Sequence, residues 1–107
     1  MFNIFKKKEQ PWSFDQPKNC AVITLRQIIN HDVPILVVYH DIDDDGWQFM
    51  SNIETTMEDM MLVSLEEITK IDSTVFEVST IQPGYHAWRN NVGSKWIIEQ
   101  TPPEDNE

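Results

Sequence analysis

The strongest hydrophobic pattern in the chain is a pair of apolar runs separated by a short acidic segment. Residues 35–39 form an unbroken apolar run, mostly of β-branched and aromatic side chains, which is typical of a strand buried on both faces. In residues 47–51, Trp47 and Phe49 share one face if the backbone is extended. The connecting residues 40–46 end in Asp-Gly, a strong hairpin signal. The pattern therefore predicts a β-hairpin with an acidic tip, on which the rest of the chain packs.

Helical spacing occurs at two places in the chain. Residues 25–30 place apolar side chains three and four positions apart, and Thr24 can cap this segment. Ser64 and Glu67 have the spacing of a capping box, and apolar residues on one face of 65–72 follow. We expect a short helix at each place.

Three more strands are predicted, at residues 20–24, 60–63 and 96–98, where short apolar runs recur. With the hairpin and the two helices, their order along the chain indicates an α+β fold. We expect a mostly antiparallel sheet of about four to five strands, with two short helices on one face.

The chain is expected to divide into three parts. Residues 1–19 are a lead segment whose two prolines disfavour a long helix, and Trp12 and Phe14 are expected to lie across the core. Residues 20–100 form a single α+β domain, and the Pro- and acid-rich residues 101–107 are expected to be a disordered tail.

The charge balance narrows the classes of partner. The 107 residues carry 18 acidic and 8 basic side chains, for a net charge of −10. Such a chain does not suit binding to nucleic acid or to anionic lipid, and favours a basic partner or simply good solubility. The single cysteine, Cys20, excludes an intrachain disulfide. No apolar run approaches the ~20 residues of a membrane span or forms a secretory signal, so we expect a cytoplasmic protein.

The acidic tip of the hairpin is the first candidate for chemistry. Asp41, Asp43 and Asp45 followed by Gly46 match the opening half of a calcium loop. The match ends at the twelfth position, where Asn52 replaces the bidentate Glu, and the flanks are predicted strands rather than helices. We expect a solvated acidic turn and no metal site, with weak divalent-cation binding as the alternative.

Catalytic motifs are weak in this sequence. The three histidines have no zinc-site spacing, and the three glycines form neither a phosphate-binding loop nor a nucleophile elbow. We therefore expect neither an enzyme nor a bound cofactor. Trp88 and Arg89 are residue types that dominate protein interfaces, although for Trp88 and Trp96 we favour packing in the core.

Four segments also resemble a known family. They are residues 20–24 (Cys-Ala-Val-Ile-Thr), 34–51 with Asp-Gly-Trp-Gln-Phe, 63–68 (Val-Ser-Leu-Glu-Glu-Ile), and 83–97 with Pro-Gly-Tyr-His-Ala-Trp-Arg, Val-Gly and Trp-Ile. Over about residues 20–98 the chain resembles small bacterial proteins of the immunity-protein type 33 family. The resemblance implies that the chain binds and blocks a cognate toxin, and it supplies no catalytic residue.

Our leading hypothesis is a non-enzymatic binding protein that neutralises a basic protein toxin by occlusion. The alternative is a domain that binds a small molecule or a divalent cation, and a weaker one is an enzyme with a cleft beside Trp88. The residues predicted to contact the partner combine the acidic tip with nearby aromatic and Arg side chains. They are Asp41, Asp43, Asp44, Asp45, Trp47, Trp88 and Arg89.

Overall fold

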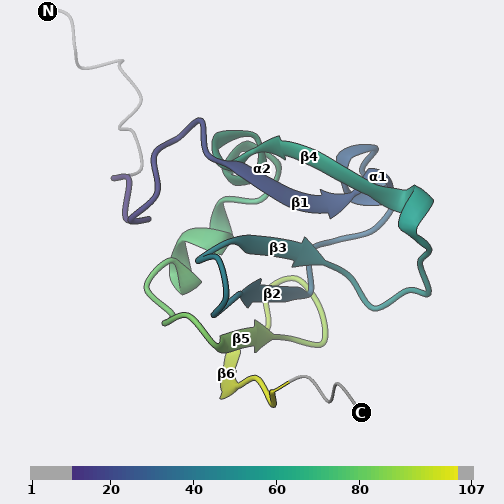
Figure 1. Cartoon of the computed structure of the whole chain (residues 1–107). Coiled ribbons are helices and arrows are strands. Elements are labelled where there is room, and N and C mark those ends of the chain that lie inside the picture. The colour runs from purple at the N-terminus through teal and green to yellow at the C-terminus, as the bar shows by residue number, and fades with distance from the viewer. Residues whose placement is uncertain (1–10, 104–107) are drawn as a thin grey trace, which may run out of the picture.

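The computed structural model describes residues 11–103, so the predictions for 1–10 and 104–107 lie outside the described residues. The fold is α+β, as predicted, and is built on one six-stranded sheet with the order β4-β1-β3-β2-β5-β6 (Figure 1). The strands are β1 Ala21–Leu25, β2 Val37–His40, β3 Trp47–Met50, β4 Met60–Ser64, β5 Tyr85–Trp88 and β6 Ile97–Gln100. The helices are α1 Arg26–Ile29 and α2 Leu65–Ile71, with the 3-10 helices η2 Met57–Asp59 and η3 Ser73–Val78.

The predicted hairpin is confirmed, and it forms the centre of the sheet. Strands β2 and β3 pair antiparallel, with Val37 opposite Met50 and His40 opposite Trp47. Four of the five strand pairings are antiparallel, and β1 with β3 is the parallel one. The sheet has six strands rather than four to five, because residues 85–88 form β5, which the sequence pattern did not predict.

One of the two predicted helix caps is correct. The Glu67 amide donates to Ser64 Oγ at 3.1 Å, which caps α2 as expected, but the return bond from the Glu67 side chain that would complete a capping box is not formed. The Thr24 cap is wrong, because Leu25 takes the cap position of α1 without a side-chain bond. Thr24 is instead buried in β1 and donates its hydroxyl to the Phe49 carbonyl at 2.8 Å, where it satisfies a buried polar group.

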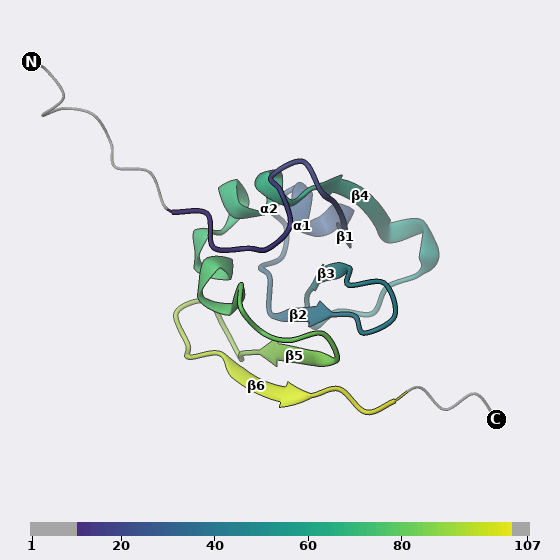
Figure 2. The same cartoon turned by 60° about the vertical axis from the view of Figure 1, so that its left-hand side comes forward.

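The two faces of the sheet differ. Helices α1, α2 and η3 cover one face, and no helix within residues 11–103 covers the other (Figure 2). Burial alternates accordingly along β2 and β3: Val38 and Phe49 are fully buried, whereas Val37 and Met50 are half-buried. The core therefore lies between the sheet and the helices, and alternate side chains of the same strands remain available on the other face.

The segment before β1 closes the covered side of the sheet. Phe14 is buried and packs edge-on against Trp47, with ring centroids 5.1 Å apart, and Trp12 meets Phe76 of η3 at 5.7 Å. The Trp12 indole N–H donates to the Gln16 carbonyl at 2.7 Å, which folds this segment back on itself. Residues 12–16 are thus part of the packed body.

Candidate binding surface

The uncovered side of the sheet carries two rows of side chains across its central strands. Tyr39 pairs with Gln48 on one side and His86 on the other, and Val37 lies likewise between Met50 and Trp88. All six side chains are half-buried, and they alternate with the fully buried residues of the same strands, although Met50 also touches the core. We call these six residues the open face: Val37, Tyr39, Gln48, Met50, His86 and Trp88.

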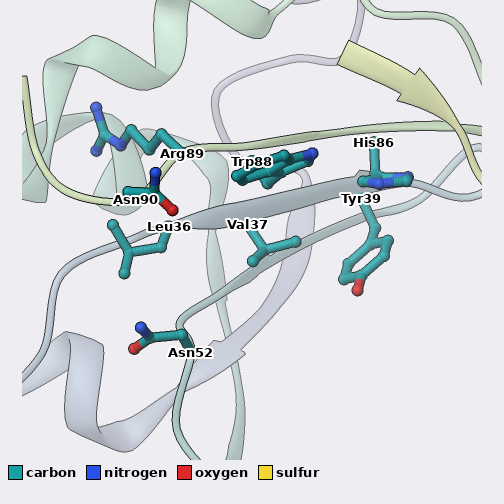
Figure 3. A pocket seen from close by; sticks show the side chains of 8 residues that line it. All are labelled: Leu36, Val37, Tyr39, Asn52, His86, Trp88, Arg89 and Asn90. Carbon is teal, nitrogen blue, oxygen red and sulfur yellow. The ribbon is translucent and has the colours of Figure 1, made fainter. Parts of the chain in front are cut away.

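A hollow of about 330 Å³ lies on this open face. Figure 3 shows Val37 near its centre, with Trp88 on one side and Asn52 on the other, and with Tyr39 and His86 toward one end. The lining also includes Leu36, Arg89 and Asn90, so that four aliphatic or aromatic side chains share it with two amides, the His86 imidazole and the Arg89 guanidinium. Such a surface suits contact with apolar or aromatic groups and offers few charges for catalysis.

Strand β6 fixes the orientation of the aromatic side chains on β5. The Trp88 indole N–H donates to Glu99 Oε1 at 3.1 Å, and His86 Nε2 lies 3.5 Å from the same oxygen. The other ring nitrogen of His86 lies 2.8 Å from the Thr101 hydroxyl. These contacts fix the positions of the Trp88 and His86 side chains within the chain itself, and such pre-ordering is a feature that lowers the entropy cost of binding in general.

Tyr39, His86 and Glu99 were missed as site residues. The alternation of faces within residues 35–39 was a usable signal for Tyr39, because a strand with one open side exposes every second residue. His86 and Glu99 gave no local signal, since β5 and β6 bring them together from different strands.

Three aspartates of the acidic hairpin tip form hydrogen bonds within their own chain. Asp45 has a left-handed backbone with φ of 60°, and its Oδ1 lies 2.6 Å from His40 Nε2 while its Oδ2 accepts from the Gln16 amide at 3.0 Å. Asp44 accepts from the Gly46 N–H at 2.9 Å. Asp41 accepts from Gln48 at 2.8 Å and so lies at the end of the open face.

These internal bonds change the chemistry expected of the tip. Internal donors occupy oxygens of three carboxylates that a cation would need, and Asp43 and Asp44 are exposed to solvent. Within residues 11–103, no three His, Cys, Asp or Glu side chains are grouped so that they could hold a metal ion. What the tip can offer is negative charge at the rim of the open face.

Trp47 does not lie where a partner could reach it. Its side chain is 2% exposed, and its ring stacks on His40 with centroids 3.9 Å apart. Its indole N–H donates to Gln16 Oε1 at 2.9 Å, and the other nitrogen of His40, Nδ1, donates to the Ile81 carbonyl at 2.8 Å. The prediction that Trp47 contacts a partner is therefore corrected: the alternation that aligns it with Phe49 directs it into the core.

Arg89 is also placed inside the fold, with 3% exposure. Its guanidinium donates to Asp72 Oδ2 at 2.7 Å, to the Thr74 hydroxyl at 2.9 Å and to the Ile35 carbonyl at 2.9 Å. The Trp96 ring covers it at 4.0 Å. The guanidinium is thus held by the chain itself, while the Arg89 side chain also lines the hollow beside Trp88, so its contact with a partner stays a prediction.

The carboxyl partner of Arg89 has a shifted pKa. Burial acts to raise the pKa of Asp72, but the hydrogen bonds from Thr74 and the Arg89 guanidinium outweigh it, and the pKa lies below the ordinary aspartate value. The pair therefore remains charged at neutral pH, and it joins the residues after α2 to the end of β5.

Comparisons with protein-family models, with curated proteins and with solved structures found no match. The resemblance to the immunity-protein type 33 family therefore stays a prediction. In residues 11–103, no helix has the length and apolar character needed to cross a bilayer.

Proposed function

We propose that this chain is a non-enzymatic binding protein that neutralises a basic protein toxin by covering it with the open face of its sheet. The observation that carries this proposal is the uncovered, mainly apolar row of side chains across β3, β2 and β5. The solvent-facing side of an antiparallel sheet usually carries polar side chains. This side instead carries Val37, Tyr39 and Trp88.

The chemistry of the open face suits a protein interface. Tyr and Trp are among the residues that contribute most binding energy at interfaces, since each buries a large rigid ring and can also form a hydrogen bond. Trp88 is already fixed by Glu99, and the hollow beside it can receive one apolar side chain of a partner. These features support a central anchor point on the face.

The charge of the chain supports a basic partner. The net charge is −10, and Asp41 and Glu99 stand at the margins of the open face, with the exposed Asp43 and Asp44 beyond Asp41. Opposite charges around an apolar centre accelerate association and select the partner, more than they add to its affinity. This arrangement matches the toxin-binding role that the resemblance implies.

A small planar molecule is the second candidate ligand for the same hollow. Its volume of about 330 Å³ is close to the lower end of small-molecule sites, which is about 300 Å³. Tyr39, His86 and Trp88 could stack on such a molecule, and Asn52 and Asn90 could donate to it.

Affinity measurements with a basic candidate toxin, such as the product of an adjacent reading frame, test the proposal. We expect Trp88→Ala to weaken binding at least about tenfold, a loss of ~1.4 kcal/mol or more. Trp12→Ala is the matched control, because it removes the same side chain from the covered side. Equal losses in both variants, or an affinity that is the same at about 0.05 and 0.5 M salt, contradict the proposal.

A further inference from the structure

The two edges of the sheet are protected to different degrees. Strand β6 contains the charged Glu99 and is followed by Pro102 and Pro103, and it exposes Ile97 and Ile98. Strand β4, Met-Met-Leu-Val-Ser, contains neither a charged residue nor a proline. In the described part of the chain no strand lies beyond β4, which forms one margin of the sheet (Figure 1).

Apolar side chains are exposed on both faces of β4. Leu62, which lies opposite Ile23, is 71% exposed on the uncovered side, and Met61 is 38% exposed on the side of the helices. Met57, in the 3-10 helix η2 just before the strand, is 84% exposed. A strand that completes a fold usually has charged or polar residues at such positions. This one has the composition of an interior strand.

The backbone of β4 can accept another strand. The Leu65 N–H donates to the Cys20 carbonyl at 2.8 Å, and Val63 lies opposite Val22. Because hydrogen bonding alternates along antiparallel strands, Met61 and Val63 bond to β1, while Leu62 directs its N–H and C=O away from the sheet. Two backbone groups at the centre of the strand are thus available to a partner.

Acidic side chains stand at both ends of β4. Glu54 and Glu58 are exposed before it, and Glu67 is exposed after it. Two nearby cations are engaged: Arg26 pairs with Asp59 at 2.9 Å, and Lys18 lies 4.0 Å from Glu66. A second copy of this chain would bring the same acids together, whereas a strand with basic ends would meet opposite charge at both ends.

We propose that the free edge of β4 adds one extended strand of a partner protein, apolar in its centre and carrying Lys or Arg at both ends. The five residues of β4 span about 17 Å, enough for main-chain pairing with a short segment. Main-chain bonds to Leu62 give general affinity, contacts with Leu62 and Met61 favour apolar side chains, and the flanking acids select basic ends. This site is separate from the open-face anchor at Trp88.

A synthetic peptide, Lys-Lys-Val-Thr-Val-Thr-Val-Lys-Lys, tests the proposal on the full chain by NMR titration. We expect the amide signals of Met60–Ser64 to shift and exchange of the Leu62 amide with solvent to slow. The same peptide with Glu at its ends is expected to bind at least about tenfold more weakly. N-methylation of one alternate set of peptide residues is expected to abolish binding, and methylation of the other set to preserve it.

Variants of the two edges complete the test. Leu62→Lys is expected to weaken peptide binding at least about tenfold by opposing the basic peptide, and Ile98→Lys, the matched change on β6, is expected to have little effect. Trp88→Ala leaves peptide binding unchanged, which separates this site from the proposed toxin-binding face. The proposal is overturned if millimolar peptide causes no shifts in β4, if shifts centre on β6, if the Glu-ended peptide binds equally, or if the chain alone dimerises through β4.

Discussion

On strands β2, β3 and β5, neighbouring residues lie on opposite faces of the sheet and differ in burial. Val38 is buried against the helices, and its neighbour Val37 lies in the hollow of the open face. Arg89 is 3% exposed and bonded to its own chain, its neighbour Trp88 is half-buried on the open face, and both line the hollow. The comparison shows that residue type alone does not identify a contact residue here; the side of the strand does.

The largest difference between the faces is expected at Arg89 and Trp88. Arg89→Ala should lower the free energy of unfolding by about 3–5 kcal/mol, because it leaves the Asp72 carboxylate partly buried without its cation. Trp88→Ala should lower it by clearly less, since its side chain is half-buried. Urea unfolding followed by far-UV circular dichroism measures both. Equal losses would mean that Trp88 is a core residue.

The valine pair sharpens the same comparison without a change of charge. Val38→Ala should destabilise the fold by about 2–3 kcal/mol, because it opens a cavity in the core at a side chain with 0% exposure. Val37→Ala removes the same atoms from the open face and should change stability by less than about 1 kcal/mol. The midpoints of urea unfolding, at unchanged m-value, report the difference. A larger loss for Val37→Ala would reverse the assignment of the faces.

The hairpin tip allows a smaller test of which acidic residues hold the structure. Asp45→Asn should lower the unfolding free energy by about 1–2 kcal/mol, because Asp45 bonds the buried His40 and Gln16 together. Asn tolerates the left-handed backbone at this position, so the change alters the charge and one hydrogen-bond acceptor without straining the backbone. Asp43→Asn, at an exposed position, should remain within about 0.5 kcal/mol of wild type. Thermal unfolding of both variants makes the comparison, and similar losses would contradict it.

The smallest expected effect concerns pH. The pKa of Asp72 is lower in the folded than in the unfolded chain, because its bonds with Thr74 and Arg89 outweigh the opposing effect of burial. The folded state therefore binds fewer protons, and this stabilisation is complete above the ordinary aspartate pKa and is lost as the pH falls below about 4. Asp72→Asn should flatten the dependence of unfolding free energy on pH in this range. Part of the slope remains, because the Thr56 amide and then Arg26 also lower the pKa of Asp59. An unchanged slope in the variant would contradict the role of Asp72.

Local signals in the sequence were sufficient for the hairpin and for α2. The Asp-Gly turn between two apolar runs and the Ser64 cap act over a few residues, so they can be identified without a tertiary structure. The parallel pairing of β1 with β3 could not be predicted in this way. It depends on where α1 directs the chain, and on a pairing between residues 25 positions apart, Thr24 and Phe49.

The candidate site could be predicted only in part. Trp88 was identified from its residue type, and the structure places it on the open face. Arg89 was selected by the same criterion, but its partners Ile35, Asp72 and Thr74 come from distant segments and enclose it. The sequence pattern placed Trp47 on the same face of its strand as Phe49, and Phe49 is buried. The prediction that Trp47 contacts a partner did not follow this pattern. Alternation within a strand was the more informative signal.

The most direct test of the open face as the binding surface is an NMR map of the indole N–H signals in a complex with a basic candidate toxin. Trp88 lies on the open face, whereas Trp47 is buried on the covered side and donates to Gln16. The proposed function predicts a large shift of the Trp88 indole signal, with the Trp47 signal nearly unchanged. A complex that shifts the Trp12 signal and leaves that of Trp88 in place would mean that the partner binds the helix side, and would contradict the account.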